Sequence, residues 1–93
     1  MPVEMHSVVV RVEDLMSTPL DEEIVILNMV KDHYVGLDET GRAVWDLLAE
    51  PRRVDELCEL LSREFDATPG EIAADVLPFL EELREEGLVR FAG

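Results

Sequence analysis

The spacing of apolar residues changes once along this chain of 93 residues, and the change falls at Asp38. Before Asp38, β-branched and aliphatic residues gather in short runs with a period of two, as in strands with one buried face. After Asp38, apolar residues recur every three or four positions, as in amphipathic helices. A chain with strands first and helices afterwards is expected to form one α+β domain over residues 1–93.

Three short runs before Asp38 are predicted as strands: Ser7–Val12, Glu23–Asn28 and His33–Leu37. The residues Asp14 to Glu22 include Ser17, Thr18 and Pro19 and are predicted as a loop. Val30 to Asp32 are short enough for a hairpin, and aspartate tolerates the left-handed backbone that such turns often need. We therefore expect a three-stranded antiparallel meander with the third strand at its edge.

Three helices are predicted after the strands: Glu39–Ala49, Val54–Phe65 and Pro69–Glu86. Asp38 is a suitable N-cap for the first helix. Thr68, Pro69 and Glu71 form a capping box for the third, and Gly87 is its expected C′ residue. Gly41 is unfavourable in a first helical turn unless another backbone packs closely there.

The charge of the chain limits its partners. There are 22 acidic and 8 basic residues, for a formal net charge of −14. Such a chain repels phosphate backbones and anionic membranes, so neither nucleic acid nor membrane is an expected partner. The acidic residues are spread along the whole chain, so most of them are interpreted as a solvated surface, and a basic peptide or protein partner is the alternative interpretation. A single cysteine and the lack of a signal pattern in Met1 to Ser7 predict a cytoplasmic protein.

Catalytic chemistry is not expected. Cys58 falls on the buried stripe of the second predicted helix, where it is interpreted as a core residue. His6 and His33 lie far apart in sequence and lack partners at metal-ligand spacing. No glycine-rich phosphate loop is present. The chain is predicted to be no enzyme, with no catalytic residue, metal or cofactor.

The third predicted strand has an unprotected edge. Edge strands usually carry lysine, proline or inward charges, and His33–Leu37 has no lysine or proline. Gly36 leaves room for a close backbone. Either the third helix covers this edge, or a partner strand pairs with it by β-augmentation.

The third predicted helix has two adjacent apolar rows. One is a narrow stripe that is predicted as core and consists of Ile72, Val76, Phe79 and Leu83. The second row comprises Ala73, Leu77, Leu80 and Arg84. The sheet buries this second row, or the row forms the floor of a groove beside the edge strand.

Several segments together resemble the PqqD-like family of leader-peptide recognition domains. They are Ile24–Asn28, Tyr34–Gly41, Ala43–Leu48, Val54–Leu57, Asp75–Leu83 and Gly87–Val89. Asp32 and Asp38 stand where that family more often has glycine and asparagine, and both can serve as turn and cap residues.

The resemblance implies a winged-helix-like fold that binds the leader of a ribosomal precursor peptide as an added strand. The leader lies antiparallel to the third strand, against the third helix, and the domain presents it to a separate modifying enzyme or leader peptidase. A lasso-peptide or pyrroloquinoline-quinone pathway is implied. The implied peptide-binding residues are His33, Tyr34, Val35, Gly36 and Leu37 with Ala73, Val76, Leu77, Leu80 and Arg84.

Two other functions are considered. The last two predicted helices resemble a helix-turn-helix pair, so a winged-helix DNA-binding regulator is one alternative, against which the acidic third helix argues. The other is a structural subunit that forms a homodimer through the open edge of its sheet.

Overall fold

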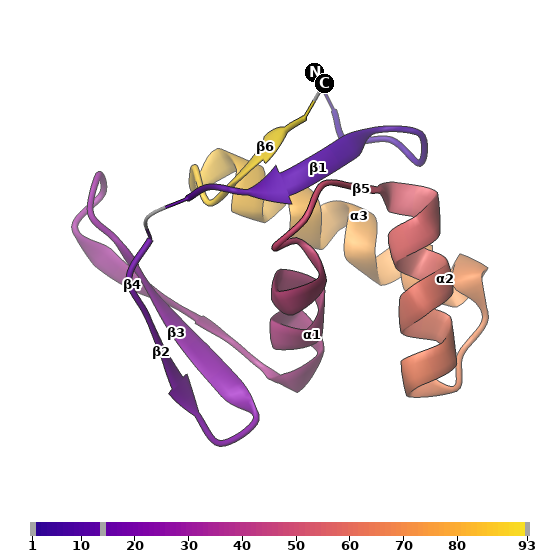
Figure 1. Cartoon of the computed structure of the whole chain (residues 1–93), viewed down its shortest axis with the longest axis horizontal. Helices are drawn as coiled ribbons and strands as arrows, with labels where there is room; N and C mark the ends of the chain where they lie inside the picture. Colours follow the sequence, from indigo (N-terminus) through magenta and orange to yellow (C-terminus); the bar gives the residue numbers. More distant parts are fainter. Residues whose placement is uncertain (1, 14, 93) are drawn as a thin grey trace.

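The computed structural model of the chain describes residues 2–13 and 15–92. Its elements are β1 (Val8–Arg11), β2 (Ser17–Leu20), β3 (Glu23–Asn28), β4 (His33–Leu37), α1 (Glu39–Leu47), β5 (Arg52–Arg53), α2 (Val54–Phe65), α3 (Pro69–Glu85) and β6 (Val89–Phe91). The strands form two antiparallel sheets, in the orders β5-β1-β6 and β2-β3-β4. Figure 1 shows α1 between the two sheets. The predicted α+β class is confirmed.

Strand β1 does not belong to the meander in which the sequence placed it. It pairs with β5 on one side, where Val8 lies opposite Arg53. On its other side it pairs with β6, where Val9 lies opposite Phe91. The C-terminal residues fold back onto the core, where β6 takes a place beside β1. The placement of β1 in the meander was wrong, because a period of two identifies a strand but not the strands that pair with it.

The prediction of a loop over residues 14–22 was wrong, because part of this segment forms strand β2. The first residue of the predicted loop, Asp14, lies outside the described residues. Ser17 to Leu20 pair with β3, and Pro19 lies opposite Ile24. The amide of Leu27 donates to the carbonyl of Met16 at 2.9 Å, so Leu27 directs its backbone groups towards β2. Backbone groups alternate in direction along a strand, so those of Ile24 point towards β4. Pro19, opposite Ile24, therefore lies at a position where an amide would point away from β3. A proline is tolerated there because no ladder bond is lost.

The predicted turn and cap residues are confirmed. Asp32 has φ +57° in the hairpin between β3 and β4. The carboxylate of Asp38 accepts from the amide of Gly41 at 2.8 Å, which caps α1. Thr68 caps α3 through the amide of Glu71, and Gly87 has φ +76° after its end. Such side-chain caps satisfy amides that a helix leaves without partners in its first turn.

The core is continuous through both sheets and all three helices. The fully buried side chains are Val9, Ile26, Val44, Leu48, Val54, Leu57, Cys58, Leu61, Leu80, Leu83 and Leu88. The Trp45 side chain is also buried, with 3% exposed. Within the described part of the chain, no helix has the length and apolar character that crossing a membrane requires. One core therefore joins the two sheets and leaves β4 at its margin.

Candidate functional site

The outer edge of β4 offers backbone groups without a strand partner. Leu27 is paired with Tyr34 and directs its own backbone groups to β2. The backbone N–H and C=O groups of Tyr34 therefore point away from β3. Gly36, two residues further on, has the same orientation. No described strand pairs with this side of β4. Tyr34 is 71% exposed, and a Cβ added to Gly36 would meet no atom within 4 Å.

A groove runs between this edge and α3 and contains two adjacent hollows. The first is lined by Gly36, Leu37, Asp38, Thr40, Gly41, Val44, Asp75, Val76 and Phe79. The second is lined by Lys31, Tyr34, Val35, Gly36, Leu37, Phe79, Glu82, Leu83, Glu85 and Glu86. Residue numbers rise along β4 as they fall along α3, so the strand and the helix run in opposite directions. Phe79 lines both hollows, as do Gly36 and Leu37, so the two hollows meet at these residues.

Gly41 sets the shape of the first hollow. A Cβ on this buried residue would lie 3.2 Å from Leu37 Cβ and 3.2 Å from Phe79 Cζ. Both distances are shorter than an ordinary van der Waals contact. The sequence predicted a close backbone at this position, whereas the structure places side chains there. Glycine therefore allows Phe79 to pack against the first turn of α1 while its ring still lines the groove.

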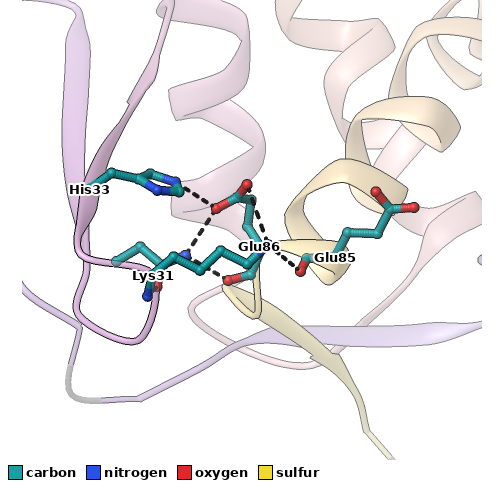
Figure 2. Close-up of polar contacts among 5 residues, drawn as sticks. Lys31, His33, Glu85 and Glu86 are labelled. Atoms are coloured by element: carbon teal, nitrogen blue, oxygen red, sulfur yellow. Dashed lines mark hydrogen bonds and ion pairs between the residues drawn. The ribbon is translucent and has the colours of Figure 1, made fainter.

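Polar contacts close one end of the groove by joining the β3–β4 hairpin to the end of α3. Figure 2 shows the Glu86 carboxylate pointing to His33, with the atoms Nε2 and Oε2 2.9 Å apart. Asn28, which is 3% exposed, donates to the carbonyl and the carboxylate of Glu86, both at 2.9 Å. Lys31 Nζ lies 3.8 Å from Glu86 Oε1 and donates to the carbonyl of Glu85 at 3.3 Å. We call these five residues the hairpin clamp.

The clamp favours the charged form of Glu86. Burial by itself would raise the pKa of this carboxyl group. Hydrogen bonds from Asn28 and His33, with the nearby charge of Lys31, outweigh burial and hold the pKa below its ordinary value of 4.5. The carboxylate is therefore the form that holds the hairpin against α3 at neutral pH.

The structure separates the residues that the sequence assigned to the helix wall. Leu80 is fully buried in the core, and Ala73 and Leu77 pack against the core. Arg84 lies over the Phe91 ring at 5.7 Å and pairs with Glu81, on the side of β6. Of the five predicted wall positions, Val76 alone is among the residues that line the two hollows. Their role in peptide binding is untested and stays a prediction.

The stripe predicted as core is confirmed as core at Ile72, Val76 and Leu83, and the same stripe also provides the apolar wall of the groove. Val76, Phe79 and Leu83 line the groove, although Val76 and Leu83 are also buried against the core. Phe79 is half-buried. The sequence signal that was missed is the position of Asp75 and Glu82 seven residues apart, with Phe79 between them. All three lie on one helix face.

The groups considered for catalysis or metal binding have the surroundings of structural residues. Cys58 is fully buried, and desolvation, with the charge of Asp55, raises the pKa of its thiol, which keeps it protonated. His6 lies 3.3 Å from Glu4, near the N-terminus. Over residues 2–13 and 15–92, no cluster of three or more His, Cys, Asp or Glu side chains could hold a metal ion. The groove is thus the feature with the geometry of a binding site.

Comparison with known proteins agrees with this geometry. The structure of TbiB1 in complex with the TbiA(beta) leader peptide is similar over 90% of this chain and 98% of its own, with 26% identity and a TM-score of 0.78. The solution NMR structure of the PqqD truncation of Methylobacterium extorquens PqqCD, a stand-alone RiPP recognition element, shares the fold, with 24% identity, a TM-score of 0.73 and coverage of 89% and 88%. No match was found among curated proteins. The family of coenzyme PQQ synthesis protein D (PqqD) matches residues 23–89, and this chain therefore belongs to the PqqD family.

Proposed function

We propose that this chain is a non-catalytic domain that binds the leader of a ribosomal precursor peptide as an added strand along β4. The observation that carries the proposal is the unpaired outer edge of β4 beside the groove against α3. TbiB1, which is similar in fold over nearly its whole length, was solved with a leader peptide. Main-chain bonds to the edge supply affinity, and side-chain hollows supply specificity.

The size of the edge indicates how much the groove must contribute. Tyr34 and Gly36 each present one backbone donor and one acceptor, and a hydrogen bond adds about 1 kcal/mol net. Micromolar binding corresponds to about −8 kcal/mol, so the ladder supplies roughly half of it before the entropy cost of ordering the peptide. An apolar side chain that becomes fully buried contributes about 1.5–3 kcal/mol. Guest side chains in both hollows are therefore needed for micromolar affinity.

The test is a proline placed at Gly36, because proline removes the outward amide without removing a bond to β3. Isothermal titration with the leader encoded next to this chain's gene should give a dissociation constant near micromolar for the natural protein. Gly36→Pro should weaken binding by about tenfold or more, since it removes a ladder bond and fills space in the groove.

Ser17→Pro is the matched control, because Ser17 has the same outward orientation on the opposite edge of the same sheet. It should leave the affinity unchanged. Circular dichroism checks that both variants are folded. Equal binding by the natural protein and Gly36→Pro, or no binding of the leader by the folded natural protein, would contradict the proposal.

The proposal includes a second partner, a modifying enzyme or leader peptidase that acts on the bound precursor in the cytoplasm. A peptide held along β4 leaves its remaining residues outside the groove, where another protein can reach them. Pull-down of that enzyme by this chain in the presence of the precursor tests this step. Recovery that does not depend on the precursor would show that the enzyme binds elsewhere on the chain.

A further inference from the structure

Two carboxylates on α3 face the groove without a basic partner. Asp75 lines the first hollow and Glu82 the second, and both residues are exposed. Within the part of the chain that the structure describes, neither makes an ion pair, whereas Glu86 is held by Lys31 and His33. These two carboxylates are therefore available to a guest that carries positive charge.

Asp75, Phe79 and Glu82 form one line along the helix, with the aromatic ring between the two acids. At 1.5 Å per residue, Phe79 lies about 6 Å beyond Asp75 along the helix axis, and Glu82 lies about 4.5 Å beyond Phe79. In an extended guest, alternate residues face the helix at intervals of about 6.6 Å. Three consecutive helix-facing guest residues therefore fit opposite this line, and flexible lysine or arginine side chains span the small difference.

We propose that the guest strand is basic and carries the pattern cation–x–apolar–x–cation on its helix-facing side. The central apolar side chain packs on Phe79 where the hollows meet, and the flanking lysine or arginine residues pair with Asp75 and Glu82. The pattern is symmetric, so it holds for either strand direction. This inference rests on the proposed function and adds to it the chemical class of peptide that the groove selects.

The charge of the groove supports the choice of a basic peptide over an acidic one. The carboxylates that line the two hollows are Asp38, Asp75, Glu82, Glu85 and Glu86, and Lys31 is the one lysine or arginine in either lining. Asp38 accepts from the amide of Gly41, and Lys31 is held by Glu86. An acidic guest would meet like charges with no free cation of the linings to offset them.

The experiment selects binders from a display library of random short peptides on the immobilised full chain. Enriched peptides are then measured by fluorescence anisotropy against the natural protein, Asp75→Asn/Glu82→Gln and Glu59→Gln/Glu64→Gln. The last double variant makes the same change of charge on exposed positions of α2, outside the two hollows. Each exposed ion pair contributes up to about fivefold in affinity, so the groove variant should bind about tenfold more weakly. The α2 variant should bind as the natural protein does.

The possible outcomes separate this inference from the proposed function. Enrichment of lysine or arginine on both sides of an apolar residue, lost with Asp75→Asn/Glu82→Gln, supports both. Enriched peptides without this basic pattern, or equal affinity for the groove variant, would overturn the inference alone, provided that Gly36→Pro weakens their binding by about tenfold or more. Failure to enrich any peptide, or enriched peptides that bind Gly36→Pro as tightly as the natural protein, would overturn both.

Discussion

The outer edges of the two sheets are protected to very different degrees. Strand β5 consists of Arg52 and Arg53 alone, and β6 has three residues with Arg90 at its centre. The outer edge of β2 has Pro19 where an amide would point outwards. Short length, charge and proline are the usual means of preventing strands from pairing with other chains. Strand β4 has five residues and none of these means.

The difference is informative because the unprotected edge also lies beside the groove. An exposed edge without a hollow would be a liability for aggregation, and a hollow without an edge would bind side chains only. In this chain both features are formed by β4 and α3. We infer that the other edges are closed so that only one surface accepts an added strand.

The largest expected effect separates the two faces of α3. Leu80→Ala should lower the free energy of unfolding by about 3 kcal/mol, because it leaves a cavity in the core. Phe79→Ala should lower the free energy of unfolding by about half as much, because Phe79 is only half-buried. It should nevertheless weaken leader binding more than Leu80→Ala does. Urea unfolding and isothermal titration measure the two quantities. A larger loss of stability for Phe79→Ala would contradict the assignment of these faces.

A smaller effect tests whether the β5-β1-β6 sheet contributes to the stability of the fold rather than to leader binding. The Arg11 guanidinium lies 5.4 Å from the centre of the Trp45 ring. Arg11→Gln should lower the free energy of unfolding by about 0.5–1 kcal/mol and leave leader affinity unchanged. Arg90→Gln, at an exposed position of β6, is the control and should change stability by less than about 0.5 kcal/mol. Weaker leader binding by Arg11→Gln would show that the β5-β1-β6 sheet also contacts the peptide.

The smallest expected effect concerns the hairpin clamp and its pH dependence. Because the pKa of Glu86 is lowered by folding, its charged form stabilises the fold above the ordinary pKa of 4.5. This contribution is lost as the pH falls through the lowered pKa of the folded state. Glu86→Gln should therefore be less stable than the natural protein at neutral pH, and the difference should shrink in acid. Urea unfolding of both proteins at neutral pH and below pH 4.5 measures this difference in the free energy of unfolding. A difference that is constant with pH would exclude the clamp as its source.

Local patterns in the sequence predicted the helices and their ends well. Asp38 and Thr68 accept the expected cap hydrogen bonds, and α2 has the predicted bounds. The structure ends α1 at Leu47 and α3 at Glu85, slightly earlier than predicted. Caps and helical periodicity depend on residues a few positions apart, so they are visible without tertiary contacts.

The partners of the strands could not be predicted in the same way. Val9 pairs with Arg52 on one side and Phe91 on the other, both far away in the sequence, in a sheet that places its side chain in the core. The segment around Pro19 was predicted as a loop because serine, threonine and proline favour turns, yet its pairing with β3 overrides that preference. Non-local pairing decides these cases.

The sequence by itself determined the α+β class, the hairpin and edge position of β4, the helix caps and an acidic surface that is compatible with a basic guest. Only the tertiary structure decided which apolar row of α3 faces the groove. Both rows of that helix contribute to the core, and periodicity alone cannot tell which of them also lines the groove. The choice is settled by the burial of Leu80 in the core and by the contact of Arg84 with the Phe91 ring, which leave Phe79 facing β4.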